Sequence, residues 1–216
     1  MTYHMIRRYT DILSVIDVVQ ERRLTLLSPT RWVDMNDRHA MGMYRTRIGA
    51  PGLVALCMTQ TRETFHHWQV FAGHAAGACI VFHRIPLLAR LKNEGELLHG
   101  PVRYMTHEKM AGLEFVTDEL PFLKRDVFRD EKEYRLIARS QSLESNEVRY
   151  IDIDLSLIDT IVFSPLAPSP LVQTLIRTLK AMPGAAQLNY HHSHLMNNQR
   201  WRDMLEEKAK IAHPSL

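Results

Sequence analysis

Leu53-Val54-Ala55-Leu56-Cys57-Met58-Thr59 is a nearly continuous apolar run that directly follows the turn signal Pro51-Gly52. A strand that is apolar on both of its faces is typical of the buried centre of a sheet. A second run of the same character covers Ala78 to Phe82. We therefore predict two central strands, with the rest of the chain arranged around them.

The elements on either side of these two strands mix helices and strands without a regular alternation. The patterns predict helices over Asp11–Arg23, Glu63–Gly73, Pro86–Asn93, Asp118–Asp126, Leu171–Ala181 and Arg200–Ile211, with Thr10 or Asp11 as the first cap. They predict strands over Leu24–Leu27, Val102–Met105, Glu133–Ala138, Tyr150–Ile153, Thr160–Phe163 and Leu188–His192, and a polar loop over Asp34–His39. The predicted fold is one compact α+β domain over residues 1–216, with a mixed or mainly antiparallel sheet, flanking helices, a core from about 6 to 192 and a terminal helix over 200–211.

Length, composition and charge exclude several classes of protein. The chain has 216 residues, of which 45% are hydrophobic, so it can bury a core without disulfides or metals. Cys57 and Cys79 lie inside apolar runs and are predicted to be reduced thiols. The net charge of +3 comes from interspersed signs, which indicates no general polyanion-binding surface. The chain contains neither a targeting segment nor a membrane-length apolar run, so we predict a cytoplasmic protein without a membrane partner.

The 12 histidines include the cluster His191-His192-Ser193-His194. Strand alternation would place His192 and His194 on one face, which offers two ligands for a divalent ion. No histidine combines with cysteines at a zinc spacing, so the pattern favours a solvated polar surface and predicts no metal.

Two further stretches concentrate polar groups, Arg31 to Asp37 and Phe128 to Ile137. On a strand, Glu133 and Arg135 face the same side. A buried pair of this kind is either a structural clamp or part of a site, and both interpretations stay open.

The order of the motifs resembles a bacterial family catalogued as domain of unknown function two-nine-seven-one. The features that support the resemblance lie between about Arg8 and Phe163. They are Arg8-Tyr9-Thr10, Asn36-Asp37, Cys57-Met58-Thr59, His67-Trp68, Gly77-Ala78-Cys79-Ile80-Val81-Phe82 and Glu131-Lys132-Glu133-Tyr134-Arg135-Leu136. The family's pattern N-D-P-x-E is replaced here by Asn36-Asp37-Arg38-His39-Ala40, so its proline and its later carboxylate are missing.

A more remote resemblance connects the layout to ADP-ribosyltransferase folds, which include bacterial toxins and phage-defence enzymes. This resemblance implies NAD as a substrate and cleavage of its nicotinamide bond, with a glutamate that stabilises an oxocarbenium-like sugar. It assigns Arg8 and Thr10 to the nicotinamide ribose and stacking to Tyr9 or Trp68. The catalytic carboxylate would be Glu133 or Glu131, while Asn36, Asp37 and Arg135 complete the expected site. The implied partners are a nucleotide and a protein or nucleic-acid acceptor.

Each of these residues also has a purely structural interpretation. Arg8 fits a surface charge near a terminus, and Thr10 fits a helix cap. Asn36 and Asp37 are common turn residues, and a helical tryptophan such as Trp68 is typically a core anchor.

Three classes of function therefore compete. The first is an NAD-consuming transferase or glycohydrolase, which predicts a cleft lined by Arg8, Thr10 and Glu133. The second is a non-catalytic domain that binds a nucleotide or a protein, which predicts a buried Glu133–Arg135 network. The third is a metal-dependent nuclease, which requires Asp34, Asp37, Glu131 and Glu133 to converge on one ion.

Overall fold

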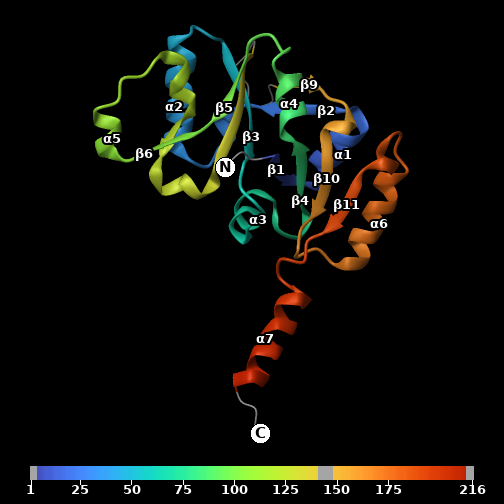
Figure 1. The fold of residues 1–216 in the computed structure, drawn as a ribbon. Coiled ribbons are helices and arrows are strands. Elements are labelled where there is room, and N and C mark those ends of the chain that lie inside the picture. The colour runs from blue at the N-terminus through green and yellow to red at the C-terminus, as the bar shows by residue number, and fades with distance from the viewer. Residues whose placement is uncertain (1–3, 141–147, 213–216) are drawn as a thin grey trace.

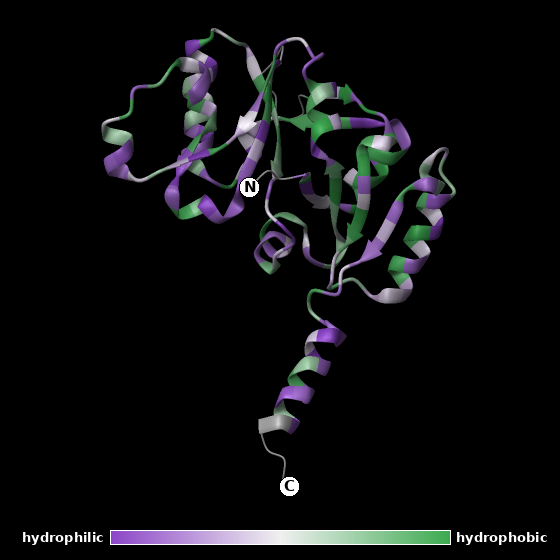
Figure 2. Cartoon of the chain, viewed as in Figure 1, coloured by the Kyte–Doolittle hydropathy of each residue, from purple (hydrophilic) through white to green (hydrophobic). Residues whose placement is uncertain are grey.

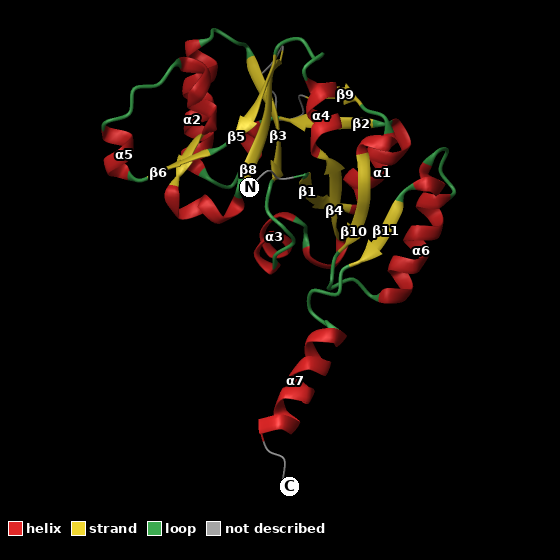
Figure 3. Cartoon of the chain, viewed as in Figure 1, coloured by secondary structure: helices red, strands yellow, loops and turns green. Residues whose placement is uncertain are grey.

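The computed structural model describes residues 4–140 and 148–212. A nine-stranded, mostly antiparallel sheet forms its centre, with helices on both faces (Figures 1 and 3). The strands of this sheet are β1 (Met5–Asp11), β2 (Arg23–Leu27), β3 (Gly52–Thr59), β4 (Gly77–His83), β5 (Leu97–Pro101), β8 (Glu133–Ser140), β9 (Val148–Asp152), β10 (Ile158–Phe163) and β11 (Asn189–His192). The helices are α1 (Ile12–Glu21), α2 (Met35–Arg47), α3 (Phe65–Phe71), α4 (Arg84–Leu91), α5 (His107–Ala111), α6 (Ser169–Lys180) and α7 (Gln199–Ala212).

One path through the sheet runs β11-β10-β4-β1-β3-β2-β9, while β8 lies between β3 and β5. The pair β10–β11 is parallel, and a separate short parallel pair joins β6 (Arg103–Met105) to β7 (Leu123–Arg125). The prediction of an α+β fold with a mainly antiparallel sheet and flanking helices is confirmed.

The two faces of the sheet bury different sets of side chains. One face packs against α1, α4 and α6 and forms the largest hydrophobic core, in which strands β4 and β10 are mostly hydrophobic (Figure 2). The other face is covered by α2 and α3, each with a smaller hydrophobic cluster. Strand β3 is buried on both faces over most of its length, which confirms the prediction of a central strand.

Strands β1 and β3 are held together by a single pair, Arg7 with Thr59. Beyond that pair β1 continues beside β4 over its full length, whereas β3 continues beside β8. The sheet therefore divides at this point into two parts, which are joined through the pair Arg7–Thr59 and share the largest hydrophobic core.

Helix α7 extends away from the rest of the fold (Figure 1). Its side chains from Gln199 to Lys210 are exposed, and they include Trp201, Met204 and Leu205. Among the described residues, no helix is long and apolar enough to cross a membrane.

Most of the predicted elements are confirmed with small shifts in their ends. Asp11 caps α1, because its side chain accepts a hydrogen bond from the Ser14 amide at 2.7 Å. The predicted helices that correspond to α3, α4, α6 and α7 are also present, as are the predicted strands that correspond to β2, β6 and β8 to β11.

The predicted polar loop over Asp34–His39 is wrong. Asp34 caps helix α2, and the polar residues after it belong to the helix. Asp and Asn favour both turns and helix starts, so the polar run alone does not separate the two. The inner stripe of α2, Asp37, Met41 and Tyr44, contains a charged residue, which hides the apolar periodicity of the helix.

Other segments also differ from the predictions, and β1 and α5 have no predicted counterpart. The helix predicted over Asp118–Asp126 is a 3-10 turn, Thr117–Phe122, followed by strand β7. Pro121 inside this segment interrupts regular helical hydrogen bonding. Strand β5 has no predicted counterpart, because Gly100 and Pro101 give its end the composition of a loop.

Candidate functional site

Five charged side chains from four elements meet beside β3 and form what we call the carboxylate cluster. Asp37 comes from α2, Lys124 from β7, and Glu131 from the end of the 3-10 turn Asp126–Glu131. Glu133 and Arg135 come from β8. All five side chains are at least nine-tenths buried.

Arg135 is the centre of the cluster and is completely buried. Its Nε donates to Glu133 Oε1 at 2.8 Å, and its Nη2 donates to Glu133 Oε2 at 2.8 Å. The same Nη2 donates to Asp37 Oδ2 at 2.6 Å, and Nη1 donates to the Pro121 carbonyl at 2.8 Å. The guanidinium carbon lies 5.0 Å from the centre of the Trp32 ring. Arg135 thus holds Glu133 with two parallel hydrogen bonds, the strongest geometry for such a pair.

The Lys124 ammonium lies where the three carboxylates converge. Its Nζ is 2.5 Å from Glu131 Oε2, 3.2 Å from Glu133 Oε2 and 3.3 Å from Asp37 Oδ2. The metal-dependent nuclease hypothesis required such a meeting point to be available to an ion. Here a lysine occupies it, and Asp34 lies at the cap of α2 instead. No metal-binding group of three or more His, Cys, Asp or Glu residues is found within 4–140 and 148–212.

Three carboxylates face two cations in the cluster, so its charge is −1 when all five groups are ionised. The groups respond differently to this environment. Burial opposes the ionised form of Glu133, but Arg135 and Lys124 outweigh it and lower the pKa of Glu133 to about 2. For Glu131, burial is the largest effect and raises the pKa despite the hydrogen bond from Lys124. Burial also raises the pKa of Asp37. Glu133 is therefore a fixed anion, while Glu131 and Asp37 bind a proton more readily than exposed carboxylates do.

Neighbouring side chains position the two glutamates through their backbone. The Thr59 hydroxyl donates to the Glu131 carbonyl at 2.5 Å, and His67 Nε2 lies 3.3 Å from the same oxygen. The Glu133 amide donates to the Tyr104 hydroxyl at 2.8 Å. Between the glutamates, Lys132 adopts a left-handed backbone conformation with φ of 43°. This conformation allows both side chains to reach Lys124, although the strand begins only at Glu133.

Arg8, Tyr9 and Thr10 all lie on β1, the strand that separates from β3 at the division of the sheet. Burial lowers the pKa of Arg8, and the thiol of Cys57 and the carboxylate of Asp11 oppose that effect. The Cys57 thiol also interacts with Glu133, and burial together with that carboxylate raises the thiol's pKa. Cys57 therefore interacts electrostatically with both Arg8 and Glu133. Tyr9 and Thr10 are buried.

The remaining predicted site residues, Asn36 and Trp68, are not members of the carboxylate cluster. Asn36 is exposed at the start of α2, where its amide and side chain donate to Asp34 Oδ1 at 2.8 and 3.0 Å. Trp68 is 1% exposed and packs edge-on against Tyr9, with the ring centres 5.1 Å apart. Its indole nitrogen donates to Glu63 Oε1 at 2.8 Å. Trp68 is thus a core anchor, as its structural interpretation suggested.

In the histidine cluster, the rings of His191 and His192 lie 5.3 and 6.1 Å from the ring of His194. His192 Nδ1 lies 3.5 Å from the Ser169 hydroxyl. These contacts connect the end of β11 to the start of α6.

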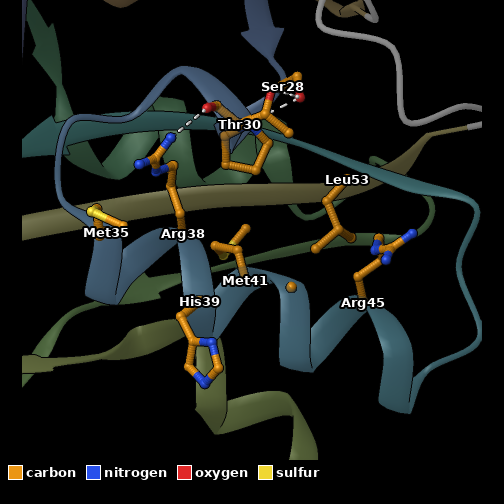
Figure 4. Close-up of a pocket in the computed structure, with 10 residues that line it drawn as sticks. Ser28, Thr30, Met35, Arg38, His39, Met41, Arg45 and Leu53 are labelled. Carbon is orange, nitrogen blue, oxygen red and sulfur yellow. Dashed lines mark hydrogen bonds between the residues drawn. The ribbon is translucent and has the colours of Figure 1, made fainter.

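Two pockets lie along α2. One of them, shown in Figure 4, has a volume of about 380 Å³ and lies between α2, the turn Pro29–Arg31 and β3. Neither pocket is lined by Arg8, Thr10 or Glu133. The cleft predicted around those three residues therefore does not correspond to either of them.

Several members of the site were not predicted from the sequence. Lys124 carries no local signal, because lone lysines are common on protein surfaces. Trp32 lies in the polar stretch Arg31 to Asp37, but that stretch does not indicate its contact with Arg135. The motif His67-Trp68 does not indicate that His67 lies beside the Glu131 carbonyl. Its spacing of three residues from Thr64 is a cap signal, and the Thr64 hydroxyl lies 2.7 Å from His67 Nδ1.

Comparison with known proteins finds similarity at the level of the fold. No protein-family model and no curated sequence matches the chain. Two similar solved structures are both of DarT from Thermus sp. 2.9. The structure in complex with NAD+ has a TM-score of 0.48 and 13% identity, covering 89% of this chain and 96% of that chain. The structure in complex with ADP-ribosylated ssDNA has a TM-score of 0.46 and 14% identity, covering 88% and 94%. The resemblance to the family of unknown function stays a prediction.

The low pKa of Glu133 predicts how stability depends on pH. Its folded pKa of about 2 lies below the ordinary value of 4.5, so ionised Glu133 stabilises the fold above about pH 4.5. That stabilisation, about 3 kcal/mol from the size of the shift, is lost as the pH falls from 4.5 toward 2. Urea unfolding of the wild type and of Glu133→Gln should measure this as a difference in stability that shrinks across the same range. Titration of carboxylates outside the cluster largely cancels in the difference, and a difference independent of pH would contradict the prediction.

Proposed function

We propose that the protein cleaves the nicotinamide–ribose bond of NAD+, as an ADP-ribosyltransferase or NAD glycohydrolase, and that Glu131 is its catalytic carboxylate. The observation that supports this most directly is the carboxylate cluster, a buried group with one more carboxylate than cations. Such an excess stabilises positive charge that develops nearby, and the sugar of NAD+ becomes positively charged as its bond to nicotinamide breaks.

The step conserves charge and atoms. The electron pair of the bond between the ribose C1′ and the nicotinamide nitrogen leaves with nicotinamide, which departs neutral, and the ribose becomes oxocarbenium-like. Water or the hydroxyl or amine of an acceptor then forms a bond to C1′ and releases a proton. A carboxylate with a raised pKa is suited to receive that proton.

The two glutamates are assigned different roles on the basis of their contacts. Both oxygens of Glu133 are bonded to Arg135, and its low pKa keeps it ionised. Glu131 is held by Lys124 through Oε2, and its pKa is raised. We assign proton transfer and contact with the ribose to Glu131. Glu133 and Arg135 act as a clamp that orients Lys124 and, through it, Glu131.

Arg8 is assigned to the nicotinamide ribose, together with Thr10, which lies two residues further along the same strand. Tyr9 points to the opposite face of β1 from Arg8 and Thr10 and packs against Trp68, so it is not assigned to stacking. Asp37 and Arg135 help to hold Lys124 and Glu133 in position within the cluster. Asn36 stabilises the start of α2 through its hydrogen bonds to Asp34. In a bacterial cytoplasm an enzyme of this kind would act as a toxin or a phage-defence effector.

The test is nicotinamide release from NAD+ by purified protein, for the wild type and Glu131→Gln. We expect the wild type to release nicotinamide and Glu131→Gln to be slower by at least about 100-fold, the range for loss of a catalytic proton-transfer group. Thermal unfolding of the two proteins should remain similar, since glutamine keeps the shape of the side chain and two carboxylates remain for the two cations of the cluster.

Glu206→Gln is the matched control, because Glu206 is an exposed glutamate on α7, away from the cluster. It should release nicotinamide at the wild-type rate. If Glu131→Gln keeps wild-type turnover, Glu131 is not the catalytic carboxylate. If the wild type releases none at high enzyme concentration, the enzymatic proposal fails as a whole.

One observation favours a second candidate, a non-catalytic domain that binds a nucleotide or a protein. Glu133 and Arg135 bind each other through two hydrogen bonds, and neither pocket along α2 is lined by them. This candidate predicts that the wild type releases no nicotinamide while Glu133→Gln lowers stability.

A further inference from the structure

Helix α2 presents a basic stripe on the side that borders the two pockets. Arg38, Gly42 and Arg45 are spaced i, i+4 and i+7, so they follow one another along one side of the helix. Asp37, Met41 and Tyr44 form the neighbouring stripe, which is buried. The same helix therefore contributes Asp37 to the carboxylate cluster, and Met41 with the basic stripe to the pocket shown in Figure 4.

The pocket shown in Figure 4 combines an apolar floor with cationic ends. Met41 and Leu53 lie between Arg38 and Arg45 in Figure 4. Seven residues separate the two arginines, which corresponds to about 10 Å along a helix axis. Ser28 and Thr30 add hydroxyl groups, and Arg38 Nη1 lies 3.4 Å from the Thr30 carbonyl. The described residues that line the two pockets include arginines and a histidine but no carboxylate.

Gly42 lines both pockets and lies inside the helix. Glycine in the middle of a helix is destabilising relative to alanine. Packing against the rest of the chain does not require a glycine here, because a Cβ at this position would meet no atom within 4 Å. The missing side chain instead leaves the helix surface open between Arg38 and Arg45, where a ligand can approach the backbone.

We propose that the pocket shown in Figure 4 binds a nucleoside phosphate. Arginine binds phosphate oxygens with paired hydrogen bonds, and the apolar floor suits the flat face of a base. A volume of about 380 Å³ falls within the roughly 300–1,000 Å³ of small-molecule sites. This site is separate from the carboxylate cluster and does not depend on the enzymatic proposal.

Isothermal titration calorimetry tests the proposal with ATP, adenosine and inorganic phosphate as separate probes. We expect ATP to bind at least tenfold more tightly than adenosine or phosphate alone, because only ATP occupies both the floor and the cationic ends. The double variant Arg38→Gln/Arg45→Gln should bind ATP at least tenfold more weakly than the wild type. Arg177→Gln, at an exposed arginine on α6, should bind as the wild type does.

Two glycine variants test the pocket by shape. Gly42→Phe should abolish ATP binding, because the ring would fill the opening. Gly42→Ala adds one carbon into open space, so it should keep most of the binding and raise the melting temperature. Equal ATP binding by the wild type and the double variant would overturn the proposal, as would equal binding of ATP and adenosine or the absence of ATP binding.

A short single-stranded oligonucleotide serves as a further probe, because it carries the same chemistry in a polymer. If the oligonucleotide binds more tightly than ATP and the double variant loses that binding, the ligand of this pocket is part of a nucleic-acid chain rather than a free nucleotide. Nicotinamide release by the double variant separates the two proposals. Wild-type turnover together with lost ATP binding supports an independent site, whereas loss of both would assign the pocket to NAD+ and overturn the independent site.

Discussion

Arg135→Met is expected to lower the free energy of unfolding by about 3–5 kcal/mol, the range for removing one partner from a buried ion pair. The substitution removes the guanidinium that binds Glu133 and Asp37, and leaves Lys124 as the only cation for three buried carboxylates. It also removes the hydrogen bond to the Pro121 carbonyl and the contact with Trp32. Urea unfolding followed by circular dichroism would measure the loss.

Arg139→Met is the matched control, because Arg139 lies on the same strand and is exposed. Surface substitutions usually change stability by less than about 0.5 kcal/mol. A loss below about 1 kcal/mol for Arg135→Met would show that the cluster relaxes or takes up protons when its central cation is removed.

Trp68→Ala is expected to destabilise the fold by about 3–5 kcal/mol, as buried tryptophans and phenylalanines typically do when truncated. Trp68 fills the cluster on the face covered by α3, together with Tyr9, Ala72, Cys79 and Val81. Its removal leaves a cavity beside Tyr9 and leaves Glu63 with the Ser193 hydroxyl as its remaining described partner. Since Glu63 connects α3 to the segment after β11, the variant should also loosen that segment.

Thermal and urea unfolding of Trp68→Ala should be compared with Trp201→Ala. Trp201 is 61% exposed on α7, so its truncation removes a tryptophan without opening a cavity in the core. The expected change for Trp201→Ala is within about 0.5 kcal/mol. If the two variants unfold alike, Trp68 does not anchor the core.

The parts of the fold that the sequence predicts well are those governed by local patterns. The apolar run Leu53 to Thr59 predicts β3 because a strand buried on both faces needs apolar residues throughout. Asp11 predicts the start of α1 because capping depends only on nearby backbone groups. Helix α2 was missed because Asp37 occupies its inner stripe, where a helix usually has an apolar residue. The partners of Asp37, Lys124 and Arg135, lie far from it in the sequence.

The candidate site shows the same division between local and distant information. Alternation along a strand predicts that Glu133 and Arg135 face one side, and the structure pairs them directly. Their spacing does not indicate that both oxygens of Glu133 are occupied by Arg135. Nor does it indicate that Lys124, seven residues from Glu131, reaches all three carboxylates. The left-handed Lys132 determines the direction of Glu131, and a lysine at that position gives no signal of such a conformation.

The ammonium of Lys124 has one further consequence, because it is covalently part of the chain. A dissolved ion occupies three converging carboxylates in proportion to its concentration, whereas a tethered cation is present whenever the chain is folded. The carboxylate cluster therefore carries its own counter-ion. The balance of charge in the cluster is therefore set when the chain folds and does not depend on the ion concentrations of the surrounding solution.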